Sequence, residues 1–133
     1  MPVDGEQGYF DGIVKTNSIS GDALRYFSES FGERFWRGLK AAVDGQIKKY
    51  IFLPSNRIEW IMVGKKRDYL IISEFYCSCE DFYINVVLRR SVKYCYHILA
   101  KKLAEALKSF EEIKVEDTKY ERFMCEWRKI EDG

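Results

Sequence analysis

The chain has 133 residues, of which 47% are hydrophobic, 16% are aromatic and 32% are charged, with both signs of charge spread along it. This composition predicts one folded domain with a modest core and excludes a disordered chain. No apolar run approaches the ~20 residues that a membrane span needs, and the start lacks a signal-peptide pattern, so we expect an intracellular protein. The net charge of +1 is low for a monomer that binds nucleic acid tightly on its own, which favours a protein partner.

The amino-terminal part predicts a lead-in followed by one helix. Residues 1–18 contain Gly and Asp without a clear period, which predicts a loosely ordered segment with a short strand at residues 9–15. From about Ser20, apolar residues recur at three- and four-residue steps and predict an amphipathic helix capped by Ser20 or Asp22. The stripe consists of Leu24, Phe27, Phe31, Phe35, Leu39 and Val43.

Two glycines lie inside this predicted helix. Gly32 and Gly38 each cost about 1 kcal/mol against alanine in a helix interior. Burial of the aromatic stripe must offset that cost, unless a close packing contact requires a residue without a side chain.

A period of two then replaces the helical period and predicts an antiparallel sheet. The runs QIKKYIFLP, RIEWIMV and DYLIISEFYC predict the three strands of a meander, with GKKR at residues 64–67 as a hairpin loop. The run DFYINVVLRR at residues 81–90 alternates again and predicts a further strand that pairs back on its predecessor. The apolar face of that strand would consist of Phe82, Ile84, Val86 and Leu88.

Helical periods return in the carboxy-terminal part and predict two helices. The stripe that follows Cys95 consists of Leu99, Leu103, Ala106, Leu107 and Phe110. A last segment places one apolar face on Tyr120, Phe123, Met124, Trp127 and Ile130.

Three of the four cysteines and the only histidine form the pattern C-x-C-x15-C-x-H. Cys77 and Cys79 follow a predicted strand, where residues i and i+2 point to the same side, so both sulfurs can face one point. In a helix such a pair diverges by about 200°, so we expect Cys95 just before a helix and His97 in its first turn. These four donors are those of a closed tetrahedral zinc site, which is structural because no position stays open for water. The alternative is a set of buried thiols, the description that we give to Cys125.

With this spacing, the chain resembles the SWIM zinc fingers, and the residues between the ligands resemble the Shu-complex SWIM proteins. Phe82 matches an aromatic residue three positions after the second cysteine, and VLRRS at residues 87–91 matches a V-L-R-basic-S stretch. The helix sequence HILAKKLAEAL is also similar. The resemblance covers residues 75–110, and it departs from the subfamily at Glu80, where proline is usual, and at Tyr96, where a basic residue is common.

The resemblance implies a non-catalytic subunit that pairs with a paralogue of the RecA/RadA-family recombinase. The pair would support assembly of the recombinase filament on single-stranded DNA in homologous recombination, without a membrane or a small-molecule substrate. The chain contains no G-x-x-x-x-G-K-[ST] phosphate loop, in agreement with a subunit that is not an ATPase. The alternatives are a stand-alone DNA-binding SWIM finger and a purely structural subunit.

For catalysis the sequence offers little. Glu29, Glu33 and Glu59 share no motif, His97 is assigned to the metal, and the chain has no second histidine to act as a general base. Cys125 lacks such a partner as well. We therefore expect no enzyme.

Basic residues surround the predicted zinc finger. From residue 64 to residue 102 there are eight Lys or Arg against four Asp or Glu, so this part is locally basic. The candidates for contact with a DNA backbone are Arg89, Arg90 and Lys93, with Lys65, Lys66 and Arg67 on the hairpin, and Tyr83, Tyr94 and Tyr96 could stack bases. The alternative is an ordinary solvated face, and Arg89 could instead hydrogen-bond to the zinc thiolates.

Three aromatic residues are candidates for contact with the protein partner. Trp36 lies off the main line of the amino-terminal stripe, and Phe123 and Trp127 belong to the last stripe, which could also pack on the core of the chain itself.

The predicted fold class is α+β, with an amino-terminal helix, a small antiparallel sheet, a strand-strand-helix SWIM finger and a carboxy-terminal helix. The expected segments are a lead-in at 1–18, helix and meander at 19–74, the finger at 75–110 and the last helix at 111–133.

Overall fold

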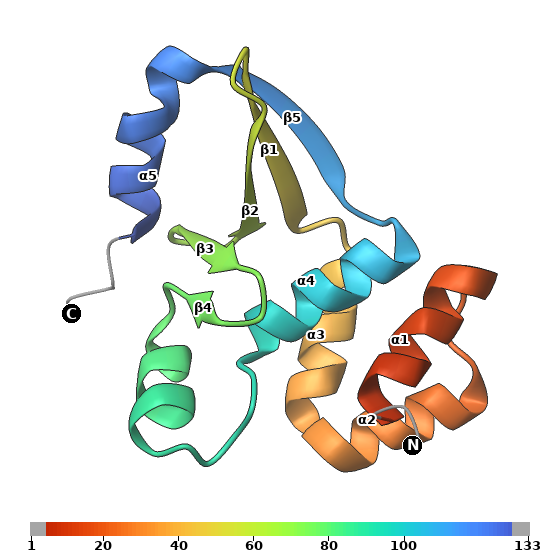
Figure 1. Ribbon diagram of the computed structural model, residues 1–133. Coiled ribbons are helices and arrows are strands. Elements are labelled where there is room, and N and C mark those ends of the chain that lie inside the picture. The colour runs from red at the N-terminus through yellow and green to blue at the C-terminus, as the bar shows by residue number, and fades with distance from the viewer. Residues whose placement is uncertain (1–4, 129–133) are drawn as a thin grey trace.

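The computed structural model describes residues 5–128 and shows an α+β fold, as predicted (Figure 1). Three helices are followed by four consecutive strands, and one more strand lies between α4 and α5. The elements η1 and η2 are a π-helix and a 3-10 helix. The elements are α1 (Gly5–Thr16), α2 (Gly21–Phe31), α3 (Glu33–Val43), β1 (Ile47–Leu53), β2 (Arg57–Val63), β3 (Asp68–Ile72), β4 (Tyr76–Cys77), η1 (Phe82–Leu88), α4 (Tyr96–Leu107), β5 (Glu111–Glu116), η2 (Asp117–Lys119) and α5 (Tyr120–Arg128).

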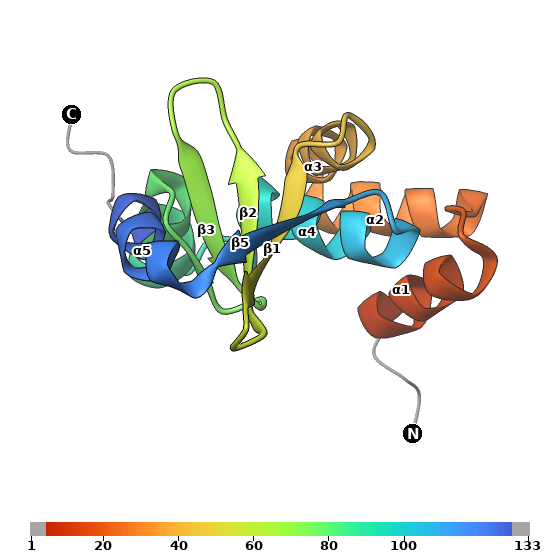
Figure 2. The same cartoon turned by 90° about the horizontal axis from the view of Figure 1, so that it is seen from above.

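The strands form one sheet in the order β4-β3-β2-β1-β5. The pairs from β1 to β4 are antiparallel, which confirms the predicted meander, whereas β5 runs parallel to β1. Helices α3 and α4 lie on one side of the sheet and α5 lies on the other, as Figures 1 and 2 show from two directions. Both faces of the sheet are therefore covered.

Each face of the sheet packs in its own core, because successive side chains of a strand point to opposite faces. The strand residues that face the helical core are Ile47, Met62 and Ile71. Those that face α5 are Phe52, Ile61 and Leu70, which pack with Met124 and Trp127. The apolar stripe of the last helix is thus a second layer of the fold, although its predicted member Ile130 lies outside the described residues.

Helix α4 is the centre of the helical side, because it contacts α1, α3 and the sheet. It is buried around most of its surface, in agreement with its predicted apolar stripe. The closest approach is at Gly38 of α3, where a Cβ atom would lie 3.1 Å from both the Tyr96 carbonyl oxygen and the Ala100 nitrogen. The close packing contact that could require a glycine is therefore present at this position.

The single helix expected from about Ser20 to Val43 is two helices, so that prediction is wrong. The chain breaks at Gly32, whose φ of 59° and ψ of −133° end α2 and precede α3. The apolar stripe continues across the break because both helices pack on the same core. Ser20 is the predicted cap, since its Oγ accepts a hydrogen bond of 3.1 Å from the Ala23 N–H.

The expected loose lead-in, with a strand at residues 9–15, is replaced by helix α1. Glu6, Phe10 and Ile13 are its buried residues, at the spacing of one helical face, and they pack against α2 and α4. The sequence reading failed here because only two of these three residues are apolar. Residues 1–4 lie outside the described part of the chain.

Two further strand predictions are wrong. The run 68–77 is divided by a turn into β3 and the two-residue strand β4. The expected strand at 81–90 is the π-helix η1, in which Phe82 is the buried residue while Val87 and Leu88 are exposed. Alternation alone cannot make a strand where no neighbouring strand is long enough to pair with it.

Strand β5 was not predicted. Its sequence EEIKVE places Ile113 and Val115 between charged residues, a pattern too short to separate from the flanking helices.

The division of the chain into segments at 1–18, 19–74, 75–110 and 111–133 remains a prediction. Within residues 5–128, no helix is long and apolar enough to cross a membrane.

A buried carboxylate ties α1 to the chain just before α4. Glu6 accepts hydrogen bonds from the Tyr94 hydroxyl at 2.6 Å and from the Lys93 Nζ at 2.9 Å. Burial would raise the pKa of Glu6, but these hydrogen bonds outweigh burial and the pKa lies below its ordinary value. A lowered pKa means that the ionised carboxylate stabilises the fold above pH 4.5 and that this contribution is lost as the pH falls through the lowered pKa.

We predict that Glu6→Gln lowers the free energy of unfolding by about 1.5–3 kcal/mol, the usual range for hydrogen bonds to a charged group. The difference should be the same at about pH 7 and pH 5.5, because both lie above the unfolded pKa. Urea unfolding at the two pH values measures it, with the exposed Glu29→Gln as control. Equal losses from both variants, or a difference that shrinks by pH 5.5, would contradict the role of Glu6.

We also predict opposite effects for two helix glycines. Gly38→Ala should cost about 1–3 kcal/mol of stability, because its Cβ meets the backbone of α4. Gly12→Ala, in α1 with no atom within 4 Å of its Cβ, should stabilise the protein by up to about 1 kcal/mol. Thermal unfolding of the two variants measures the effects, and a neutral Gly38→Ala would show that α3 and α4 are not in this contact.

Candidate metal centre

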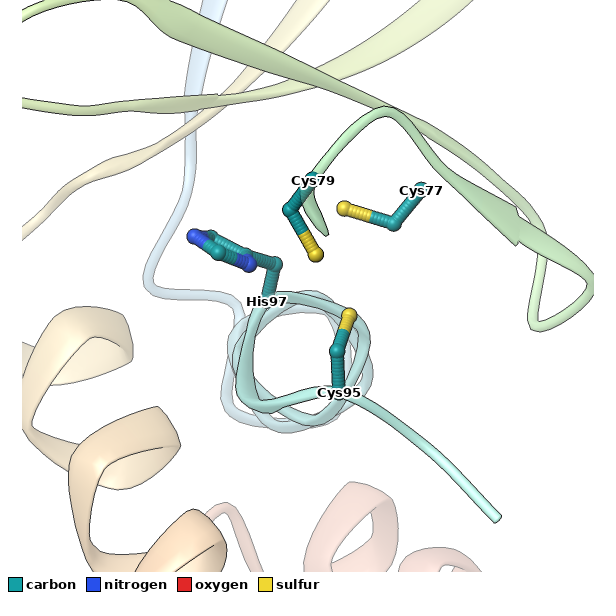
Figure 3. Close-up of side chains that lie close together, drawn as sticks. All are labelled: Cys77, Cys79, Cys95 and His97. Carbon is teal, nitrogen blue, oxygen red and sulfur yellow. The ribbon is translucent and has the colours of Figure 1, made fainter. Parts of the chain in front are cut away.

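The four predicted ligands come together between the edge of the sheet and the start of α4 (Figure 3). Cys77 ends β4 and Cys79 follows in the next turn, while Cys95 is the residue before α4 and His97 lies in its first turn, as expected. All four side chains are buried, and their ligand atoms lie within 4.8 Å of one another. In Figure 3 the three sulfurs point toward one another, and the imidazole of His97 lies beside them.

Backbone hydrogen bonds hold the Cys77-x-Cys79 segment in place. Ser78, between the two cysteines, accepts a bond of 2.9 Å from the Leu70 N–H on its Oγ and donates its own N–H to the Leu70 carbonyl at 3.0 Å. The Phe82 N–H then donates to the Cys79 sulfur at 3.2 Å, which draws the chain into the helical turn of η1. No feature of the sequence predicted that Ser78 anchors the segment to β3.

The imidazole of His97 is oriented by two aromatic rings. The Tyr69 and Tyr96 ring centres lie 4.3 Å and 4.1 Å from that of His97. Both ring nitrogens of His97 are buried, and neither has a hydrogen-bond partner within residues 5–128. Metal-bound histidines usually donate their other N–H to a carboxylate or carbonyl, so here ring packing takes over that orienting role.

Guanidinium groups extend this stack outward. The Arg37 Cζ lies 4.1 Å from the centre of the Tyr96 ring, and the Arg67 Cζ lies 5.1 Å from that of Tyr69. Both are within the range of cation–π attraction. Tyr96 occupies the position at which a basic residue is common in the family. Its ring lies between the imidazole of His97 and the guanidinium of Arg37.

The three buried thiols cannot all ionise without a compensating cation. Hydrogen bonds from Cys77 and Cys95 lower the pKa of Cys79. The hydrogen bond to Cys79 raises the pKa of Cys77, and burial raises that of Cys95. One thiolate is therefore favoured by the protein alone, and three become stable together only beside a multivalent cation.

This donor set fits zinc. Zinc prefers four soft or borderline donors in a tetrahedron, and these residues supply three sulfurs and one imidazole nitrogen that has no other partner. A bound ion would be closed off from solvent and would act structurally. The prediction of one structural zinc is confirmed by this cluster.

The fold and the Cys3His cluster define a zinc-finger protein with the C-x-C…C-x-H ligand pattern. No family model matches the chain, and no solved structure matches it. A Dictyostelium discoideum protein, "Zinc finger SWIM domain-containing protein 7 homolog", is 32% identical to it over 109 residues, which cover 80% of this chain and 70% of that protein. The chain therefore belongs to the SWIM zinc-finger family, and within it is similar to zinc finger SWIM domain-containing protein 7.

The predicted DNA contacts lie in different surroundings. Arg89 and Arg90 are exposed after η1, and within the described residues Arg89 makes no hydrogen bond to a ligand sulfur. Lys93 forms an ion pair of 2.9 Å with Glu6. Tyr94 is buried against Glu6 and is not available to stack a base in this structure, whereas Tyr83 is exposed.

The residues predicted to contact the protein partner also differ in their exposure to solvent. Trp36 is 46% exposed, whereas Trp127 is 4% exposed and packs with the half-buried Phe123 on the sheet. Of the two possibilities that the sequence leaves for the last stripe, the core of the chain and a docking surface, the structure shows packing on the core for Trp127. Cys125 is exposed, so the prediction that it is a buried thiol is wrong.

We predict that Cys95→Ser and His97→Ala each lose the metal and unfold the carboxy-terminal half of the chain. Structural zinc contributes on the order of 10–16 kcal/mol in finger peptides, which is as large as the stability of a typical domain. Elemental analysis and circular dichroism measure the two effects, with Cys125→Ser as the control that retains zinc. Unchanged zinc in either variant would remove that residue from the site.

Proposed function

We propose that this protein is a non-catalytic zinc-binding subunit that pairs with a RecA/RadA-family recombinase paralogue. The pair would support recombinase filament assembly on single-stranded DNA in homologous recombination, inside the cell. The observation that carries the proposal is the family membership, because the 32% identity extends over 80% of the chain and not over the ligands alone.

The nature of the metal centre supports a non-catalytic role. Its four protein donors fill a tetrahedron, so a zinc ion there would have no open position for water or substrate. His97 is buried between two tyrosine rings and packed away from solvent, which keeps it from acting as a general base. The centre is built to join β4 to α4.

Exposed apolar side chains near the finger support a protein partner. Phe75, in the turn between β3 and β4, is 76% exposed. Tyr83, Val87 and Leu88 of η1 are exposed as well, and Trp36 is exposed on α3. Large exposed aromatic residues of this kind are the side chains that dominate binding energy when a partner covers them.

Co-purification of the tagged chain from its own cells, with its companions identified by mass, tests the proposal most directly. A RecA-family protein that remains bound through washing is the expected result. Recovery of the chain alone, combined with tight DNA binding at physiological salt, would favour the stand-alone DNA-binding finger. Filament assembly with and without the chain then separates an active subunit from a purely structural one.

We predict that Trp36→Ala or Phe75→Ala weakens retention of that partner by tenfold or more, with zinc content and unfolding temperature unchanged. A central aromatic contact is typically worth about 2 kcal/mol or more. Val14→Ala is the matched control, because Val14 is also exposed but lies on α1. Quantitative pull-down measures the effect, and normal retention of both aromatic variants would exclude these side chains as the docking surface.

A further inference from the structure

A basic groove lies between helix α3 and the β2–β3 hairpin, beside the metal centre. It has a volume of about 690 Å³. The residues that carry the argument are Arg37 and Lys40 on α3, Lys65 and Lys66 on the hairpin, and Tyr69 and Tyr96. In Figure 2 the β2–β3 hairpin loop and α3 both lie toward the top of the view. Basic residues of both elements line the groove.

The charge in this groove is strongly one-sided. Four cationic side chains line it, and of the lining residues Asp44 is the acidic one. Asp44 is already engaged by Lys40 at 2.7 Å. Lys65 and Lys66 are exposed and form no ion pair within residues 5–128, so their charges are available to an anion.

The walls of the groove are held in fixed positions. Gly64 closes the hairpin, where its N–H donates to the Arg67 carbonyl at 3.0 Å and a Cβ would come within 2.5 Å of that oxygen. Arg37 packs on Tyr96, whose other neighbour is the imidazole of His97. The zinc finger thus fixes one wall and the tight turn fixes the other.

At one end the groove adjoins a pocket whose acidic residues disfavour anion binding. The adjoining pocket shares Arg37, Tyr69 and Tyr96 with it and also contains Glu33, Glu80 and Asp81. Asp81 is paired with Arg34 at 2.9 Å, but the two glutamates form no ion pair within residues 5–128. An anionic chain would therefore follow the hairpin end and avoid the Glu80 end.

From these features we infer that the groove binds the phosphate backbone of single-stranded DNA, with Arg37, Lys65 and Lys66 contacting phosphates, because the charge of Lys40 is already paired with Asp44. This inference deepens the proposed function and rests on it for the choice of single-stranded DNA as the ligand. Both tyrosine rings already pack against His97 and a guanidinium, so the groove offers charge and not free stacking platforms. Binding is accordingly independent of sequence and sensitive to salt.

The number of contacts fixes the size of the salt effect. Each phosphate contact on a single strand contributes about −0.7 to the slope of log K against log salt concentration, so three contacts give a slope of about −2. Affinity then falls roughly 20-fold between about 50 and 200 mM salt. Such binding is weak at physiological salt, which agrees with a subunit that depends on a partner.

Fluorescence anisotropy of the full chain with an oligothymidine of about 30 nucleotides tests the inference. The double variant Lys65→Ala/Lys66→Ala should bind with a slope of about −0.7, and its affinity should fall only roughly threefold over the same salt range. Lys114→Ala/Lys119→Ala, which removes two exposed charges outside the groove, should leave the slope unchanged. Arg89→Ala/Arg90→Ala tests the site suggested by the sequence with the same change in charge.

Several results would contradict the inference that this groove binds phosphates. These are no binding by the unmodified chain at about 50 mM salt, an equal change of slope in all three double variants, or a change in the Arg89/Arg90 variant alone. Equally tight binding of a poly-glutamate peptide would instead make it a site for an acidic protein. Because the assay uses the chain alone, its failure leaves the co-purification test of the recombinase partnership unaffected.

Discussion

Three sulfurs and one imidazole have to share a single buried point, and the rest of the molecule is arranged around that requirement. The donors come from the edge strand of the sheet and from the start of the central helix, two elements that local interactions alone would not hold together. Three adjacent thiolates repel one another in a medium of low polarity, so their ionisation and the binding of a divalent cation occur together. Metal binding is therefore inseparable from the folding of this part of the chain.

The consequences extend outward in both directions from the centre. On the helical side, α4 is fixed at its first turn and packs so closely on α3 that Gly38 carries no side chain at the contact. On the sheet side, Ser78 joins the ligand loop to β3 by two hydrogen bonds. Tyr69 and Tyr96 enclose the histidine between these two parts, and the arginines that pack on them carry positive charge to the surface. The same interactions that orient His97 thus shape the groove.

Sequence reasoning succeeded where the chemistry of a few residue types is decisive. The ligand spacing predicted the zinc site, the position of Cys95 before a helix and the family. It failed where tertiary contacts override a local period: the hydrogen bond to the Cys79 sulfur starts a helical turn in the alternating run 81–90, and Gly32 divides one apolar stripe between two helices. The groove was also out of reach, because Arg37 and Lys65 come together only through the packing of α3 beside the hairpin.

X-ray absorption at the zinc edge of the purified protein measures which atoms surround the metal. We expect one zinc per chain, with three sulfur neighbours at about 2.3 Å and one nitrogen at about 2.0 Å. A shell with oxygen neighbours, with fewer than three sulfurs, or no zinc in protein purified without chelator would contradict it.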